Sequence, residues 1–176
     1  VVRNYNEGLG RVGYWRMDGD WTDASGNGNS GIANNGATFS TDARVGSQAG
    51  SFDGVNDYVR VPEGSGAFDF TTGHTIEAWV KSTGSTTVYR GIVVKRNPAS
   101  SVDTNWELDI STSNKPYYCL HYNGSGGYTC VKASTSLNAA DWYHIAAGYD
   151  GATLFIYING VLESSVPFAG TPYVNN

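Results

Sequence analysis

The stretch from residue 18 to residue 29, DGDWTDASGNGN, collects side chains that could bind a metal ion. Calcium takes six to eight oxygen ligands, which Asp, Asn and backbone carbonyl groups supply. Gly26 and Gly28 let the backbone turn its carbonyls inward. The stretch is not an EF-hand, because no glutamate closes the required frame. It predicts a calcium site that uses Asp23, Asn27 and Asn29. The alternative is that these side chains only form Asx-turns.

The two cysteines, Cys119 and Cys130, flank the turn sequence NGSGG. If the loop is residues 123–126, the hairpin register puts the two cysteines directly opposite each other. Facing positions on antiparallel strands can meet the geometry that a disulfide needs. We therefore expect a disulfide, an oxidising compartment and an exported protein. The alternative is a pair of reduced cysteines.

The same register gives the hairpin two distinct faces. Tyr118, Leu120, Tyr122 and Val131 share one face, which we expect to join the core. The other face carries the disulfide and a set of polar and aromatic side chains, namely Tyr117, His121, Tyr128 and Lys132. Aromatic rings beside polar groups suit sugars, whose C–H faces pack on aromatic surfaces. The alternative is that these side chains have no ligand and occur here because tyrosine favours strands.

The elements that must position these residues are clearest at residues 142–161, WYHIAAGYDGATLFIYINGV. Asp150-Gly151 and Asn159-Gly160 suit tight hairpin turns, which predicts two strands and a third after them. With Asp150-Gly151 as a two-residue loop, Ala147 lies opposite Leu154. The alternation predicts one core face, consisting of Tyr143, Ile145, Ala147, Tyr149, Leu154, Ile156 and Ile158. The other face is aromatic and must meet another layer, a loop or a ligand; it carries Trp142, His144, Phe155 and Tyr157.

Further strands are expected at 12–17, 58–61, 75–81, 91–95 and 106–110, and an irregular loop at 18–37. Many short strands separated by turns indicate an antiparallel sandwich. At 176 residues the chain fits one domain. We assign residues 1–8 to a linker or tail and residues 9–176 to the domain. The start at Val1, without a methionine or signal peptide, predicts a segment of a longer protein.

Composition excludes several classes of function. The net charge of -5 gives no basic footprint for nucleic acid, and no apolar run reaches about 18 residues, as a membrane span requires. His74, His121 and His144 lie on different strands without metal-binding spacing, so structural roles are expected. The sequence contains no nucleophile elbow, P-loop or Rossmann fingerprint.

The segments GYWRMD, DASGNGNSG, SFDGVNDYVRVP, HTIEAWVK and DWYHIAAGYDGATLFIYINGV resemble, in this order, the laminin G-like branch of the concanavalin A-type lectins and glucanases. The resemblance implies an all-β fold, a two-sheet antiparallel jelly-roll sandwich. It implies glycan binding, adhesion or scaffolding, and frequently a calcium ion at the rim. Asp18, which ends the expected first strand, then joins the calcium ligands. The last strand of the family is not recognisable here, so the domain is expected to be C-terminally incomplete.

Related glycosidases carry a Glu, an Asp and a second Glu on one strand. Glu107 and Asp109 alternate onto one face in the same manner. Ser111 and Thr112 stand where the second Glu belongs, so the acid that protonates the leaving oxygen is missing. We therefore expect no catalytic residues.

The combined interpretation is a non-catalytic module, extracellular or on a cell surface, that binds a glycan or another surface macromolecule. Neither nucleic acid nor membrane insertion is expected. The alternative is a structural, exposed domain of a surface filament or adhesin without a glycan ligand, and glycoside hydrolysis is a weaker one. An unpaired first strand at 12–17 would be a template for a complementing strand from another segment or subunit.

Overall fold

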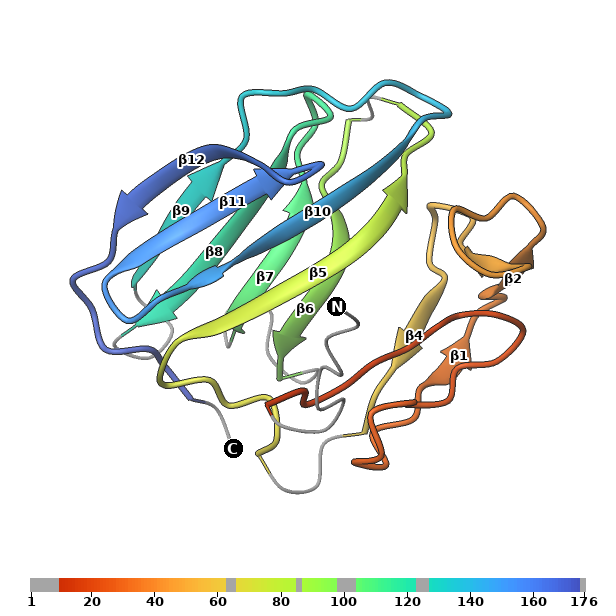
Figure 1. Cartoon of the computed structure of the whole chain (residues 1–176), viewed down its shortest axis with the longest axis horizontal. Helices are drawn as coiled ribbons and strands as arrows, with labels where there is room; N and C mark the ends of the chain where they lie inside the picture. Colours follow the sequence, from red (N-terminus) through yellow and green to blue (C-terminus); the bar gives the residue numbers. More distant parts are fainter. Residues whose placement is uncertain (1–9, 63–65, 85–86, 98–103, 123–126, 175–176) are drawn as a thin grey trace, which may run out of the picture. The chain divides into compact units, whose positions relative to one another are not determined.

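The computed structural model describes residues 10–62, 66–84, 87–97, 104–122 and 127–174 (Figure 1). Over these residues the chain forms twelve β-strands and no helix. It divides into two compact units, unit 1 up to Phe68 and unit 2 from Asp69 onward. The tail expected at residues 1–8 lies outside the described residues. No helix in the described part is long and apolar enough to cross a membrane.

Unit 2 is a sandwich of two antiparallel four-stranded sheets (Figure 1). One sheet has the order β12-β11-β10-β5 and consists of β5 (His74–Lys81), β10 (Trp142–Tyr149), β11 (Thr153–Ile158) and β12 (Val161–Pro167). The other has the order β6-β7-β8-β9 and consists of β6 (Arg90–Arg96), β7 (Thr104–Ile110), β8 (Pro116–Tyr122) and β9 (Gly127–Lys132). The predicted all-β, two-sheet antiparallel sandwich is confirmed.

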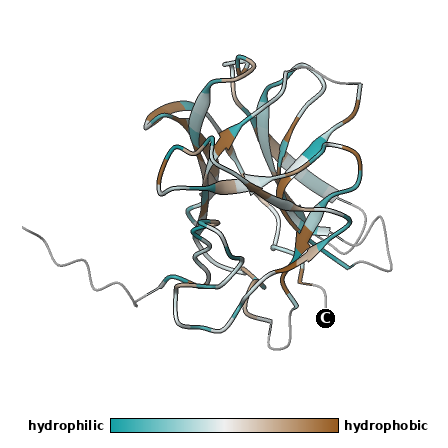
Figure 2. Cartoon of the chain, turned by 90° about the vertical axis from the view of Figure 1, so that its right-hand side faces the viewer, coloured by the Kyte–Doolittle hydropathy of each residue, from teal (hydrophilic) through white to brown (hydrophobic). Residues whose placement is uncertain are grey.

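The core of unit 2 lies between these sheets, where β11 packs over β8 and β9. The strands carry both hydrophobic and hydrophilic residues (Figure 2). The side chains with 0% exposure come from both sheets and include Leu108, Tyr118, Leu120, Val131, Ile145, Ala147, Leu154 and Ile156. Each large apolar side chain buried in this way contributes about 1.5–3 kcal/mol. The core faces predicted from the alternation are therefore confirmed, except that Tyr122 and Tyr143 are only half-buried.

His74 connects the two sheets. Its Nδ1 lies 3.0 Å from the carbonyl oxygen of Thr72, which can only accept, so Nδ1 carries the proton. Nε2 is then an acceptor, and the buried hydroxyl of Tyr118 donates to it at 2.6 Å. Burial lowers the pKa of His74, which favours this neutral ring. The structural role expected for His74 fits this arrangement.

The turn between β10 and β11 corrects the predicted register. Ala147 pairs with Ile156, not with Leu154. The carboxylate of Asp150 accepts hydrogen bonds from the N–H groups of Ala152 and Thr153, so Asp150 begins the turn instead of forming its centre. The shift is two residues, and each side chain stays on its predicted face. The Asn159-Gly160 turn and the third strand are as predicted, with both turn residues at positive φ.

Unit 1 consists of short paired strands. β1 (Ile32–Asn34) pairs with β4 (Tyr58–Arg60), and β2 (Thr38–Ser40) pairs with β3 (Ala49–Ser51). β1 lies inside the stretch predicted to be an irregular loop, and that prediction was wrong there.

The predicted strand at 12–17 was also wrong, since only Trp15 forms an isolated bridge, to Asp23. The backbone N–H of Tyr14 is bound by the Asp23 side chain instead of a neighbouring strand.

Candidate functional site

The hairpin of β8 and β9 has the predicted register. Cys119 pairs with Cys130, and the two form a disulfide across the strands with a Cα–Cα distance of 4.1 Å. Tyr122 pairs with Gly127, as a loop at 123–126 requires. That loop lies outside the described residues. The disulfide expected from the facing positions is confirmed.

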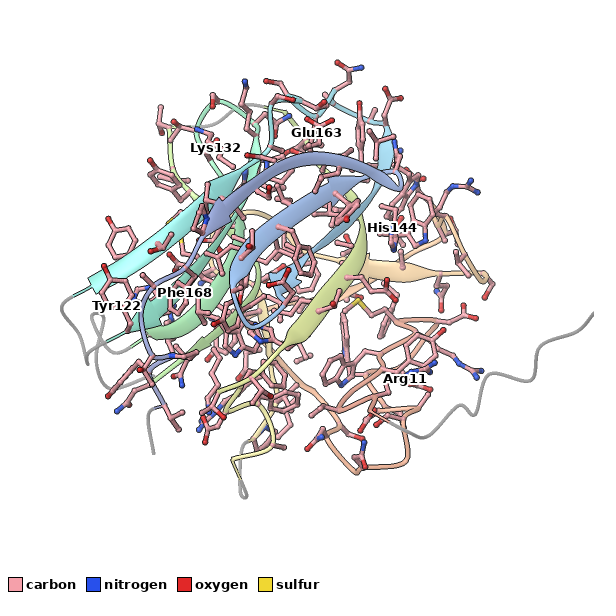
Figure 3. The ribbon with its side chains drawn as sticks, turned by 60° about the vertical axis from the view of Figure 1, so that its left-hand side comes forward. Arg11, Tyr122, Lys132, His144, Glu163 and Phe168 are labelled. Atoms are coloured by element: carbon pink, nitrogen blue, oxygen red, sulfur yellow. A yellow bond between two sulfur atoms is a disulfide. The ribbon has the colours of Figure 1, made fainter. Side chains whose placement is uncertain are left out.

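The predicted ligand-binding side chains lie on the disulfide's face of this hairpin, which points away from the core. Tyr117 and His121 are half-buried on β8, whereas Lys132 and Tyr128 are exposed on β9, the latter by 63%. Lys132 lies at the far end of β9 from the 123–126 loop (Figure 3). Tyr122 is half-buried and its ring contacts Phe168, with centroids 5.7 Å apart.

Strand β7 adds a row of acidic and amide side chains to the same face. Glu107 pairs with Cys119, and Asp109 pairs with Tyr117. Asn105 is two residues before Glu107, so the alternation puts it on this face as well. We call the resulting surface the polar face; it consists of Asn105, Glu107, Asp109, Tyr117, His121, Tyr128, Lys132 and the disulfide.

Asp109 is the most perturbed carboxyl group of the polar face. It is 7% exposed, and the Tyr117 hydroxyl donates to its Oδ2 at 2.8 Å. Burial raises the pKa of Asp109 to about 6; the charge of Glu107 raises it further, whereas the Tyr117 hydrogen bond and Arg96 oppose the shift. Burial and the bond to Asp109 also raise the pKa of Tyr117. At neutral pH Tyr117 is therefore a hydrogen-bond donor to a largely ionised Asp109.

Two pairs of aromatic rings lie on the polar face. The rings of Tyr89 and Tyr117 meet edge to face with centroids 5.8 Å apart. At the other end of β8, the rings of His121 and Tyr128 are 5.3 Å apart. Between the pairs, Nε2 of His121 lies 3.9 Å from the Glu107 carboxylate. Rings at both ends and carboxylates between them form an arrangement that can hold a sugar chain.

Sequence reasoning missed two residues of this site. Tyr89 precedes β6 and is far from the hairpin in sequence, so no local pattern connects it with Tyr117. The position of Asn105 on this face could have been predicted, because side chains alternate along a strand and Asn105 is two residues before Glu107. The glycosidase pattern consists of Glu and Asp residues and therefore does not include an amide such as Asn105.

Ser111, which stands where glycosidases have their second Glu, is 3% exposed. Its hydroxyl donates to the carbonyl of Lys115 within a turn. It supplies no acid.

Asp23 is the buried centre of the predicted calcium loop. Its Oδ1 accepts from the N–H groups of Tyr14 and Ser25, and its Oδ2 accepts from the Ser25 hydroxyl and from the N–H of Asn29, all at 2.8–2.9 Å. Burial alone would raise the pKa of Asp23, but these hydrogen bonds outweigh it and lower the pKa to about 2. Each carboxylate oxygen already has two donors.

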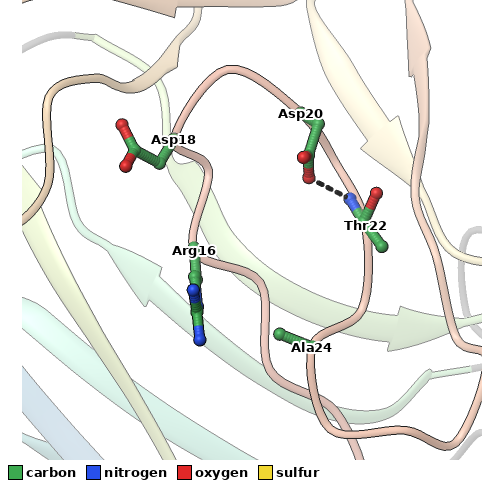
Figure 4. Close-up of a pocket in the computed structure, with 5 residues that line it drawn as sticks. All are labelled: Arg16, Asp18, Asp20, Thr22 and Ala24. Atoms are coloured by element: carbon green, nitrogen blue, oxygen red, sulfur yellow. Dashed lines mark hydrogen bonds between the residues drawn. The ribbon is translucent and has the colours of Figure 1, made fainter.

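The other predicted calcium ligands divide into two groups. The amides of Asn27 and Asn29 both donate to the carbonyl oxygen of Val12, close to Asp23. Asp18 instead accepts from the N–H and the hydroxyl of Ser47, at 2.9 and 2.7 Å. It lines a different pocket of about 310 Å³ (Figure 4), together with Arg16, Asp20, Thr22 and Ala24.

The structure therefore brings three of the four predicted ligands together. The Asp23 carboxylate accepts from the N–H groups of Ser25 and Asn29, as in the Asx-turn alternative, whereas Asn27 donates to Ser25 and Val12. Among the described residues, no three His, Cys, Asp or Glu side chains form a group that could hold a metal. Calcium at this loop stays a prediction.

A family model named for the concanavalin A-like lectin/glucanases superfamily matches residues 53–176, more than half of the chain. The chain belongs to this superfamily, and its sandwich is a jelly roll of that type. No curated protein matches the chain.

The solved structures that share the fold include the following three. Domain 4 of an extracellular arabinanase from Geobacillus stearothermophilus, in complex with arabinotriose, is 18% identical with a TM-score of 0.65 over 88% of this chain and 73% of that one. An S-layer domain-containing protein from Clostridium thermocellum is 21% identical with a TM-score of 0.56, over 88% and 71%. The binding domain of botulinum neurotoxin DC, in complex with rat synaptotagmin II, is 14% identical with a TM-score of 0.63, over 88% and 38%.

Proposed function

We propose that this chain is a non-catalytic, extracellular glycan-binding module whose ligand lies on the polar face. The observation that carries the proposal is the pair of aromatic contacts, Tyr89 with Tyr117 and His121 with Tyr128, at the two ends of a carboxylate row. Aromatic rings pack on sugar C–H faces, and carboxylates accept hydrogen bonds from sugar hydroxyls. The fold shared with an arabinanase domain bound to arabinotriose supports a carbohydrate partner.

Binding without hydrolysis is proposed because the acid/base pair is incomplete. Hydrolysis with retention requires a second carboxyl group about 5–5.5 Å from the nucleophile, with a pKa suited to protonate the leaving group. Glu107 and Asp109 are adjacent on their face, but Ser111 stands where the second Glu of the glycosidase pattern belongs and carries no carboxyl group. The Tyr117 hydroxyl also binds Asp109. The Cys119–Cys130 disulfide supports an extracellular location, because disulfides persist in oxidising compartments.

The test is a glycan array followed by calorimetric titration of the best ligand. Tyr117→Ala and Tyr128→Ala should each weaken binding at least tenfold. Tyr58→Ala is the matched control, because Tyr58 is an exposed tyrosine (49%) on β4 in unit 1 and should leave affinity unchanged.

Tyr157→Ala, on the outer aromatic face of the other sheet, tests the competing location. Loss of binding in that variant alone would move the ligand off the polar face. An array without any bound glycan would favour the alternative, a structural surface domain without a glycan ligand.

The expected calcium ion is tested separately. If calcium binds the loop of Asp23, Asn27 and Asn29, the melting temperature rises with calcium, and Asp23→Asn removes the rise. A melting temperature that is unchanged by calcium or EDTA would mean that hydrogen bonds alone stabilise the loop.

A further inference from the structure

The centre of the polar face carries hydrogen-bond acceptors that the chain itself does not use. Oδ1 of Asp109 and Oδ1 of Asn105 are buried without a hydrogen-bond partner, on residues that are 7% and 1% exposed. Glu107 lies between them with 27% of its side chain exposed, and His121 at 3.9 Å is beyond hydrogen-bond distance. A buried acceptor without a donor destabilises the folded chain. Of these three residues only Glu107 is accessible to a ligand, so the row favours a ligand that brings a donor to the Glu107 carboxylate.

Glycine at position 91 keeps the space beside this row open. Gly91 pairs with Asp109 across β6 and β7. A Cβ at this position would lie 3.5 Å from Oδ1 of Asp109 and 3.1 Å from a methyl group of Val94. Any larger side chain would extend over the Asp109 carboxylate. The backbone is therefore bare beside the Asp109 carboxylate.

The charged side chains of the polar face are separated by sign. Glu107 and Asp109 occupy the centre, whereas the cations Arg96, at the end of β6, and Lys132, on β9, are exposed. Two carboxylates at the centre repel a carboxylate or sulfate group of a ligand, and their effect is strong because the site is partly buried. A hydroxyl group suffers no such repulsion.

The two aromatic pairs fix the length of the ligand. Tyr117 and His121 are four residues apart on β8, which corresponds to about 13 Å at a strand rise of about 3.3 Å per residue. Tyr89 comes from the β6 side and Tyr128 from β9. The path between the pairs is therefore diagonal across the sheet and longer than one sugar ring.

We infer that the ligand is a neutral oligosaccharide whose end rings stack on the two aromatic pairs and whose hydroxyls donate to Glu107 between them. Glycans that carry uronic acid or sulfate at the central ring are excluded. This inference rests on the proposed function and specifies its ligand.

The experiment uses pairs of oligosaccharides that differ only in the oxidation of C6, such as oligogalactose and oligogalacturonic acid, with gluco- and manno- pairs alongside. Calorimetric titration at pH 7.5 should show the neutral member of at least one pair binding at least tenfold more tightly than its acidic partner. Glu107→Gln should reduce this ratio, because it removes charge and keeps size. Glu77→Gln, at an exposed carboxylate of the other sheet, should not.

Length is tested with the neutral member from one to five rings. Affinity should rise at least tenfold from one ring to three and then level off, and Tyr128→Ala should flatten the rise. Equal or tighter binding of the acidic partner, or a single ring that binds as well as the chain, would overturn the inference and leave glycan binding standing. Failure of every neutral and acidic ligand would overturn the proposed function together with it.

Discussion

The carboxyl group of Asp109 is buried, and burial disfavours its charged form. Strand β8 covers it on one side, and the Tyr117 hydroxyl compensates only part of the lost hydration. Its face was predictable from the sequence, because side chains alternate along a strand. The burial of Asp109 could not be predicted from the sequence, because it depends on tertiary contacts such as the one with Tyr117. The residue types of the site could thus be predicted, but their electrostatics could not.

This burial predicts an unusual dependence of stability on pH. The folded pKa of Asp109, about 6, lies above the usual 3.8. The stability linked to this group is therefore fully present below pH 3.8 and is lost as the pH rises through 6. At pH 7.5 the loss is about 3 kcal/mol. Asp109→Asn, which can still accept from Tyr117, should raise the free energy of unfolding by up to about 3 kcal/mol at pH 7.5 and by little at pH 3.5.

Urea unfolding at both pH values measures the effect. The control is Glu77→Gln, which removes a carboxylate whose side chain is 69% exposed and should change the unfolding free energy little. An effect of Asp109→Asn that is the same at both pH values would mean that its charge is not the cause.

At the scale of elements, hairpins were the most predictable parts of the chain. Asn159-Gly160 forms its turn as its sequence dictates, because both residues adopt positive φ. At Asp150 the carboxylate caps the next two N–H groups, which moves the turn along the chain. The stretch at 12–17 has the residue types of a strand, yet its backbone is bound by a side chain. Such competition by Asp is difficult to predict without knowing the tertiary contacts.

The β8–β9 hairpin gives the second prediction. Replacing both Cys119 and Cys130 by alanine should lower the free energy of unfolding by about 3 kcal/mol or less, because the closed loop is short. The core positions Tyr118 and Val131 remain, so the fold should persist. Urea unfolding of the variant against the oxidised protein measures the loss. Mass spectrometry of unreduced peptides is the control, and two free thiols in freshly exported protein would contradict the assignment.

At the scale of the whole molecule, the two units differ in how much they bury. The fully buried apolar side chains of the described chain all lie in unit 2, where two sheets face each other. Unit 1 relies on half-buried rings, such as Trp21 stacked on Phe39 with centroids 4.4 Å apart. Its only buried side chain among the described residues is Asp23. Strands β1, β2 and β3 were not predicted, because three-residue strands without a core face give no periodicity.

The free energy of local unfolding should therefore be lower for unit 1 than for unit 2. Hydrogen exchange should release the amides of β1 to β4 before those of β7, β8, β10 and β11, because local stability follows buried apolar contacts. Asp23→Ala should speed the exchange of residues 12–30 and leave β8 unchanged, which provides an internal control. Equal protection across both units would show that they unfold as one cooperative structure.

The disulfide has a consequence for when the protein becomes competent to bind. Its sulfur atoms lie between Tyr117 and His121, two residues from each, so they form the floor under the middle of the diagonal path. Because Tyr118 and Val131 still fill the core without the bond, we expect the strands to pair in the reduced chain. The shape of the floor, in contrast, depends on the bond. A chain still in a reducing compartment would fold with two thiols there. If the module acts outside the cell, as proposed, oxidation after export would complete the polar face.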